Sequence, residues 1–295
     1  MIARAPMSGL PAPALGLERL LDADSVALHR LFADGQPLSA ELTSCLSGCD
    51  LVIDSLTWGH AAARERLRGA TTGRLVELDP RPDPDSTEHI VDQWAVALRR
   101  NGVSLASTDR GEPLVLSVGN SSDGPRECLR NRCGQSGGNA PDRPWVLMHP
   151  GSGGRRKCWP LERFIQLADR LAADGCRPAF LLGPTERDWY ASSWTDRLSG
   201  HGPVICEPDL QELIRILRGA DLYVGNDAGG THLAAAAGVP TLVLFGPTDP
   251  RVWRPLGLAV HVLSPPAGPT ADMEWLGVGQ VHARCGDLLS RCPRE

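Results

Sequence analysis

The only lysine of this 295-residue chain stands in a glycine-rich loop whose residues suit an anion. Lys157 follows Gly151, Gly153 and Gly154 in the stretch HPGSGGRRKCWP, whereas all other members of the 30 Lys and Arg residues are arginines. Glycines let a backbone approach a ligand closely, and a compact ammonium adds full positive charge for a phosphate. The loop is no P-loop, and the last glycine of G-x-G-x-x-G would fall on Arg156. It predicts a phosphate site, with a solvated surface lysine as the alternative.

A second polar cluster follows an apolar run in the stretch GNDAGGTHLAAAAGVP. Asp227 ends the run, Gly229 and Gly230 follow, and Thr231 and His232 open an alanine-rich helix. The N–H groups at a helix start attract anions, so residues 229–232 are expected to face a second phosphate and Asp227 to orient a ligand hydroxyl. The alternative is a capping aspartate beside an ordinary histidine, which for His232 alone is equally acceptable.

Two further predicted strand ends carry polar side chains. The stretch FGPTDP has residues typical of a turn, which would present Thr248 and Asp249. Glu186 lies in the stretch GPTERD, directly after an apolar run. Carboxylates at such strand ends often hold ribose hydroxyls. Taken alone, each stretch is only a turn.

The elements that must position these loops alternate between strand and helix in the second half of the chain. Short apolar runs predict strands at 145–148, 179–182, 204–206, 222–224 and 241–245. Helical spacing and caps predict helices at 161–175, from about 186, after the D-x-x-E capping box at 209–212, and at 232–237. This alternation predicts a parallel sheet covered on both faces, with ligand loops 149–157, 183–187, 226–232 and 246–250 at the carboxyl ends of the strands.

The first half of the chain holds fewer such units. Strands are expected at 51–53 and 75–77, and helices at 61–67 and 90–99. The segment 117–143 is dense in Gly, Ser, Asn and Asp and predicts a linker or exposed loop. We therefore expect two domains, 1–139 and 140–295.

Composition excludes several classes of protein. A formal net charge of −5 without a basic block argues against a nucleic-acid partner. No apolar run approaches 18 residues and the N-terminal stretch lacks signal-peptide features, so no transmembrane span and a cytoplasmic location are expected. The nine cysteines are irregularly spaced and predict free thiols. Cys128 and Cys133 lack a second pair with zinc spacing, so no metal site is expected.

Together these stretches resemble glycosyltransferase family 9, the ADP-heptose:lipopolysaccharide heptosyltransferase family. The matching motifs are H-P-G-S-G-(x)-K-x-W-P at 149–160, G-x-x-E at 183–186, G-N-D-A-G-G-T-H-L at 225–233 and G-V-P-T-L-V-L-F-G-P-T-D-P at 238–250. They occur in the family's order, and the resemblance is strong over about 140–260. It implies a GT-B fold, in which two Rossmann-like domains face a cleft and the C-terminal one binds the nucleotide-sugar donor.

The resemblance also implies an activity and its residues. It implies metal-independent, inverting transfer of a heptose-like sugar from an NDP-sugar, with ADP as the expected nucleotide, to a cell-envelope glycan or glycolipid acceptor. The donor is a substrate, so no cofactor is expected; a monomer with peripheral contact at the inner face of the cytoplasmic membrane is expected. Lys157 would stabilise the leaving diphosphate as a catalytic residue, and Asp227 would position the donor sugar or its phosphate. The substrate-binding positions would be Ser152, Gly153, Gly154, Glu186 (to ribose), Gly229, Gly230, Thr231, His232 and Thr248.

One family feature has no match. The family opens with a strand, a G-A-L-G-D-like loop and a helix, and the aspartate of that loop is thought to deprotonate the acceptor. The N-terminal domain is therefore expected to be incomplete. Three explanations stay open: a misplaced start, a degenerate non-catalytic nucleotide-sugar-binding protein, or a replacement base such as Asp54 or Glu77. An NDP-sugar epimerase is a weaker rival, and the D-x-D pairs at 22–24 and 83–85 are read as polar loops.

Overall fold

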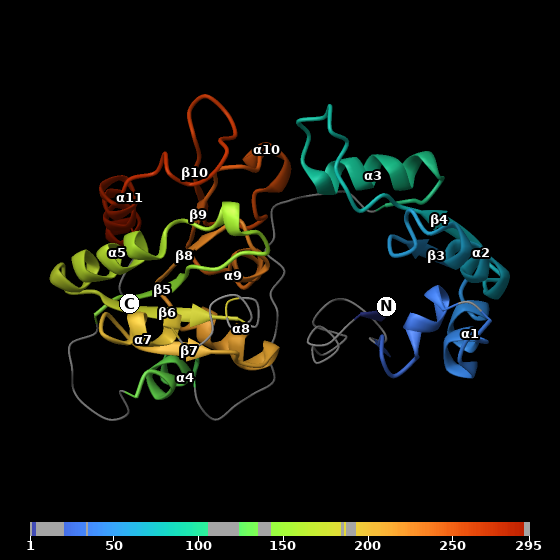
Figure 1. Ribbon diagram of the computed structural model, residues 1–295, viewed down its shortest axis with the longest axis horizontal. Helices are drawn as coiled ribbons and strands as arrows, with labels where there is room; N and C mark the ends of the chain where they lie inside the picture. Colours follow the sequence, from blue (N-terminus) through green and yellow to red (C-terminus); the bar gives the residue numbers. More distant parts are fainter. Residues whose placement is uncertain are drawn as a thin grey trace. The chain divides into compact units, whose positions relative to one another are not determined.

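The chain forms two compact units, Met1–Thr108 and Asp109–Glu295. A computed structural model describes residues 2–3, 21–33, 35–105, 124–134, 143–183, 186 and 193–291 (Figure 1). The division lies earlier in the chain than the expected boundary at 139/140. The difference arises because residues 125–132 form a helix that packs into the second unit.

A six-stranded parallel sheet forms the centre of the second unit. Its strands are β5 (Trp145–His149), β6 (Arg177–Leu182), β7 (Val204–Cys206), β8 (Leu222–Asn226), β9 (Thr241–Leu244) and β10 (Val260–Leu263). They lie in the order β10-β9-β8-β5-β6-β7, and each neighbouring pair is parallel. The chain enters the sheet at β5 and adds β6 and β7 on one side. It then returns to place β8 on the other side of β5 and adds β9 and β10 beyond it. This is the Rossmann order, and its switch point, where ligands bind in such sheets, lies between β5 and β8.

Helices cover both faces of this sheet (Figure 1). One hydrophobic core joins the sheet to α5 (Leu161–Ala173), α7 (Ser193–Ser199) and α11 (Val278–Arg291). The other core joins it to α4 (Pro125–Arg132), α8 (Leu210–Arg218) and α9 (Gly229–Ala236). In β5 the side chains of Val146 and Met148 enter the first core, and those of Trp145 and Leu147 the second. Burial on both faces explains why the strands read as continuous apolar runs.

Most predicted elements of the second unit are confirmed, with shifted ends. Asp209 caps α8, and its carboxylate accepts a hydrogen bond from the Glu212 N–H, as the capping box predicts. Helix α9 begins at Gly229 rather than at the expected residue 232. The helix expected from about 186 is described only as α7 from Ser193, because 187–192 lie outside the described residues. Strand β10 and helices α10 (Pro250–Trp253) and α11 were not predicted.

Helix α4 differs from the loop expected at 117–143. Pro125 occupies its first turn, and Leu129 is fully buried against α8. Gly219 allows this contact, because a Cβ at that position would lie 2.4 Å from the Pro125 carbonyl oxygen. A short helix with one strongly buried side chain carries little hydrophobic pattern, so composition alone indicated a loop. The stretches 117–123 and 135–142 lie outside the described residues.

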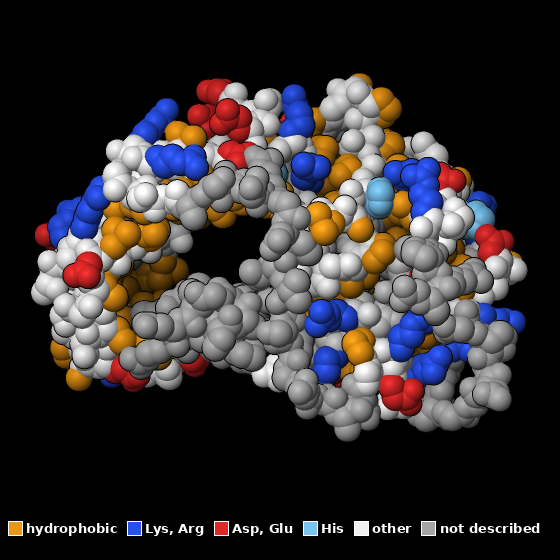
Figure 2. Space-filling view, turned by 180° about the vertical axis from the view of Figure 1, so that it is seen from behind, with side chains coloured by type: hydrophobic (Ala, Val, Ile, Leu, Met, Phe, Trp, Pro, Cys, Tyr) orange, Lys and Arg blue, Asp and Glu red, His pale blue; other side chains and the backbone are white. Residues whose placement is uncertain are grey.

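The described residues of the first unit form two short parallel strand pairs. Strand β1 (Ile2–Ala3) pairs with β2 (Leu21–Asp22), and β3 (Leu51–Asp54) pairs with β4 (Arg74–Glu77). The helices are the 3₁₀ helix η3 (Leu28–Phe32), α1 (Ala40–Ser47), α2 (Ala61–Ala70) and α3 (Ile90–Arg100). The expected strands and helices of this half are thus confirmed, and β2, η3 and α1 are additional. Apolar side chains show on its surface in Figure 2. Leu51 and Ile53 of β3 are among the exposed apolar residues of this unit.

Three further expectations from the sequence can be compared with the described residues. The eight cysteines among them are free thiols, and Cys292 lies outside them. None of the described helices has the length and apolarity to cross a membrane. The D-x-D pairs form turns: Asp22 accepts a hydrogen bond from the Ser25 N–H, and Asp83 from the Asp85 N–H.

Candidate functional site

Asn226, the last residue of β8, ties together the two loops at the switch point. Its side-chain amide donates to the carbonyl oxygens of Pro150 (2.8 Å) and Gly151 (3.2 Å). Its Oδ1 accepts a hydrogen bond from the Trp159 N–H at 2.9 Å. Both ends of the loop after β5 are therefore fixed to β8. Asn226 was not predicted as a site residue, although a polar side chain at a buried strand end is a signal of this kind.

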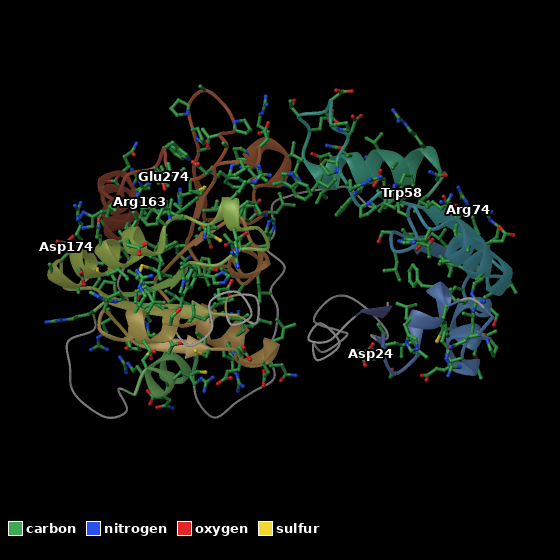
Figure 3. The ribbon with its side chains drawn as sticks, viewed as in Figure 1. Asp24, Trp58, Arg74, Arg163, Asp174 and Glu274 are labelled. Atoms are coloured by element: carbon green, nitrogen blue, oxygen red, sulfur yellow. The ribbon has the colours of Figure 1, made fainter. Side chains whose placement is uncertain are left out.

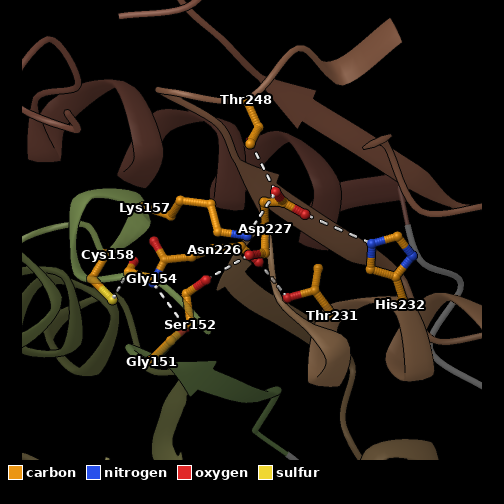
Figure 4. Close-up of polar contacts among 10 residues, drawn as sticks. All are labelled: Gly151, Ser152, Gly154, Lys157, Cys158, Asn226, Asp227, Thr231, His232 and Thr248. Carbon is orange, nitrogen blue, oxygen red and sulfur yellow. Dashed lines mark hydrogen bonds and ion pairs between the residues drawn. The ribbon is translucent and has the colours of Figure 1, made fainter. Parts of the chain in front are cut away.

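Ser152 and Thr231 hold the same turn from either side (Figure 4). The Ser152 hydroxyl donates to the Asp227 carbonyl oxygen at 2.7 Å, and the Thr231 hydroxyl to the Asn226 carbonyl oxygen at 2.6 Å. Both side chains are buried. Their hydroxyls shape the site, and the expectation that they contact substrate stays a prediction.

Asp227 lies at the centre of a cluster of donors (Figure 4). Its Oδ2 accepts from Lys157 Nζ at 3.2 Å and from the Thr248 hydroxyl at 2.8 Å. Its Oδ1 lies 3.7 Å from His232 Nε2. The structure therefore brings together four predicted site residues from three different loops, those following β5, β8 and β9.

The pKa of Asp227 lies below its ordinary value of 3.8. Burial of the carboxylate, which is 6% exposed as a residue, acts against this by raising the pKa. The nearby His232 imidazole, the Lys157 charge and the Thr248 hydroxyl together outweigh burial. Asp227 is therefore a stable anion that orients the groups around it.

The start of α9 offers fewer free N–H groups than the sequence suggested. The N–H groups of Thr231 and His232 both donate to the Ala228 carbonyl oxygen, at 3.0 and 3.2 Å. The first N–H groups of a helix have no partner within it, and in α9 these belong to Gly229, which is exposed, and Gly230, which is half-buried. Of the four N–H groups expected to face an anion at 229–232, those of Gly229 and Gly230 are therefore the ones left for a ligand, and an anion site there stays a prediction.

Among the loop glycines, packing requires only Gly151. A Cβ there would lie 1.6 Å from Glu186 Oε1, whereas one at Gly153 would meet no atom within 4 Å. At Gly154 the nearest contact would be an ordinary 3.7 Å from the Lys157 side chain. Neither Gly153 nor Gly154 adopts a positive φ. Their absent side chains leave space beside Lys157, which is what an approaching ligand requires.

Glu186 is buried between the ends of β5 and β6. Its Oε2 accepts from the Gly183 N–H at 2.6 Å and lies 3.5 Å from His149 Nε2. Burial raises the pKa of Glu186, but the neighbouring His149 imidazole and the Gly183 N–H outweigh it, so the pKa is lowered. The predicted ribose contact is therefore an ionised carboxylate held firmly from both strands.

The segment 273–276, against which the Thr248 loop packs at Gly246, is held by a residue that the sequence did not single out. Arg163 Nη1 donates to the carbonyl oxygens of residues 273, 274 and 276, and its guanidinium pairs with Glu274 (Figure 3). Trp159 Nε1 donates to the carbonyl of residue 276 as well. Gly246 packs so tightly on this segment that a Cβ would lie 2.4 Å from Met273 Sδ. The turn that presents Thr248 is therefore held from α5.

In the first unit, the two carboxylates considered as replacement bases are both engaged. Asp54 accepts hydrogen bonds from the N–H groups of Leu56 and Thr57 and from the Thr57 hydroxyl. Glu77 forms ion pairs with Arg64 at 3.2 Å and Arg68 at 3.1 Å. Each carboxylate has a structural role in its own unit.

Sequence comparisons identify relatives of the chain. A profile of glycosyltransferase family 9 (heptosyltransferase) matches residues 79–275. Lipopolysaccharide heptosyltransferase 1 of Pseudomonas aeruginosa is 33% identical over 205 residues, which cover 68% of this chain and 55% of that protein. Lipopolysaccharide heptosyltransferase 2 of Salmonella typhimurium is 25% identical over 187 residues, covering 61% and 52%. The chain thus spans about half the length of these curated relatives.

Solved structures of similar fold include two from E. coli. Heptosyltransferase WaaC with ADP superimposes with a TM-score of 0.63 at 20% identity, covering 97% of this chain and 89% of that one. ADP-heptose lps heptosyltransferase II gives a TM-score of 0.66 at 18% identity, covering 98% and 88%. These likenesses confirm the expected GT-B fold class. Since the family profile matches more than half of the chain and the motifs lie at the switch point of its sheet, the chain belongs to glycosyltransferase family 9.

Proposed function

We propose that this protein is a glycosyltransferase that takes a heptose-like sugar from an NDP-sugar, with ADP as the nucleotide, and transfers it to a cell-envelope glycan. The observation that carries the proposal is the cluster of Lys157, Asp227 and Thr248 beside the open N–H groups of α9 at the switch point. Heptosyltransferase relatives, and a similar structure solved with ADP-2-deoxy-2-fluoro heptose, support the choice of donor. Activity at the inner face of the membrane, by a monomer, is part of the same proposal.

The chemistry that these residues can perform is stabilisation of the leaving group. When the bond between the anomeric carbon and the diphosphate oxygen breaks, that oxygen keeps the electron pair and negative charge grows on the diphosphate. The Lys157 ammonium and the N–H groups of Gly229 and Gly230 are donors suited to this charge. In this proposal they supply the positive field, so that the transfer is metal-independent.

Inversion requires the acceptor hydroxyl to attack the opposite face of the anomeric carbon and to lose its proton to a base. General-base catalysis of this kind contributes about 10²–10⁴-fold. Asp54 and Glu77 are engaged by other donors, so we assign the base to neither. The same engagement favours, as a second candidate, a protein that binds the nucleotide-sugar without transferring it.

Binding of ADP by wild-type protein and by Lys157→Ala, measured by calorimetry, tests the proposal. We expect the variant to lose about 30-fold or more in affinity, as befits removal of one charged hydrogen-bond donor to phosphate. Arg170→Ala is the matched control, because this exposed cation lies in the last turn of α5, at the opposite edge of the sheet. Equal affinity of Lys157→Ala and wild type would contradict the assignment. Release of ADP from ADP-heptose with a glycan acceptor then separates an enzyme from a binder.

A further inference from the structure

His149 lies beneath the candidate site and has no role in the function proposed above. It is the last residue of β5 and is 8% exposed, and its Nε2 faces the Oε2 of Glu186, which is 3% exposed. Glu186 Oε1 lies against Gly151, at the place that a Cβ of that residue would occupy. The Glu186 carboxylate is therefore enclosed by the imidazole on one side and by the loop backbone on the other.

The far side of the imidazole reaches the start of α9. His149 Nδ1 and the Tyr223 hydroxyl are buried without hydrogen-bond partners among the described residues. Both atoms lie close to Gly230, because a Cβ on that residue would be 3.1 Å from the Tyr223 hydroxyl and 3.2 Å from His149 Nδ1. An imidazole protonated on Nε2 donates towards Glu186 and presents the Nδ1 lone pair on the side of the phenol. The ring thus spans the space between Glu186 and the N-terminus of α9.

A carboxylate as buried as that of Glu186 needs a partner to stay ionised and in place. The other titratable groups that face it are Cys158 and Tyr223, whose own pKa values are raised by burial, so both are neutral. Gly183 supplies one N–H. The imidazole is the remaining side-chain donor that faces this carboxylate among the described residues.

We propose that His149 is a positioning residue for the nucleoside: it holds the Glu186 carboxylate where that group binds the ribose hydroxyls of the donor. The inference rests on the proposed function, because it presupposes that a nucleoside diphosphate occupies the site. It predicts that His149 controls recognition of the hydroxyls and leaves recognition of the diphosphate to Lys157.

Two substitutions separate a positioning role from a general structural one. His149→Gln places an amide N–H near the position of Nε2 and can still donate to Glu186, whereas the shorter side chain of His149→Asn mimics only Nδ1. The ligands are ADP and 2′,3′-dideoxy-ADP, which lacks the ribose hydroxyls. We expect wild type and His149→Gln to prefer ADP about tenfold, as one or two charged hydrogen bonds provide. His149→Asn should bind the two ligands equally, with affinity for dideoxy-ADP within about twofold of wild type.

The outcomes distinguish this inference from the proposed function. If wild type binds neither ligand, the proposed function fails, and the inference falls with it. If wild type prefers ADP and His149→Asn keeps that preference, the inference is wrong while the proposed function stands. A wild type that binds both ligands equally also overturns it. Glu186→Gln alone should lose the preference for ADP to the same extent as His149→Asn, and the double variant should bind ADP no more weakly than either single variant. A Glu186→Gln variant that keeps the preference would contradict a role through Glu186.

Discussion

Gly151→Ala tests whether the loop after β5, which carries Lys157, depends on the Glu186 carboxylate that packs against Gly151. The added Cβ would lie 1.6 Å from Oε1, 2.1 Å from Cδ and 2.6 Å from Cγ of Glu186. Three atoms of one side chain fall within the overlap, so a small rotation of the carboxylate does not relieve it. The Glu186 side chain must leave its position and with it the Gly183 N–H and the His149 imidazole.

The expected loss of stability follows from those contacts. Hydrogen bonds to a charged group contribute about 1.5–3 kcal/mol each, and a displaced carboxylate that reaches water recovers part of this. We therefore expect Gly151→Ala to lower the free energy of unfolding by about 2 kcal/mol, measured by urea denaturation followed by circular dichroism. The preference for ADP over dideoxy-ADP should disappear in the same variant.

Gly153→Ala, two residues along the same loop, is the control. A Cβ at this exposed position meets no atom within 4 Å, and its φ is not positive, so the change should stay within about 0.5 kcal/mol of wild type. The reasoning is refuted if the two variants unfold at the same urea concentration, or if a structure of Gly151→Ala shows Glu186 unmoved.

Three further changes test the centre and the edge of the second unit. Because the pKa of Asp227 is lowered, its charge stabilises the folded state above its unfolded-state pKa and this contribution is lost as the pH falls through the lower folded-state value. The difference in unfolding free energy between wild type and Asp227→Asn should thus be constant above about pH 5 and shrink below about pH 4; a difference that grows on acidification would contradict it. Lys157→Arg should keep the ion pair with Asp227 yet lower ADP affinity about tenfold by calorimetry. Leu129→Ala should cost about 2–5 kcal/mol in urea unfolding, whereas a negligible cost would show that α4 is not part of the second unit.

The sheet of the second unit was predictable because its strands are buried on both faces. Runs such as Trp145–Met148 are apolar at every position, and turn residues separate them. Helix α11 was also within reach, because Val278, Val281, Cys285 and Leu288 recur at helical spacing. Strand β10 is only half-buried at the edge of the sheet and gives a weaker pattern. Burial, more than propensity, decided what the sequence could predict.

The candidate site was predictable in its residue types and less so in its connections. Lys157, Asp227 and Thr248 were expected because each is a polar residue in a loop after a predicted strand. The roles of Asn226 and Gly151 depend on which loops become neighbours, and neighbours are fixed by strand order. The spacing of residues along the sequence does not show that β5 pairs with β8.

The geometry around Asp227 also gives a reason for the single lysine in a chain whose other strong bases are arginines. An ammonium has three donors around a compact charge, so the contact of Lys157 with Asp227 Oδ2 leaves two N–H bonds for a phosphate. A guanidinium has a planar fork that matches a carboxylate with two parallel hydrogen bonds. An arginine at this position would direct that fork at Asp227, whose Oδ1 already faces His232, and turn its charge away from the ligand. A lysine at position 157 can therefore be oriented by its hydrogen bond to Asp227 and still donate to a diphosphate.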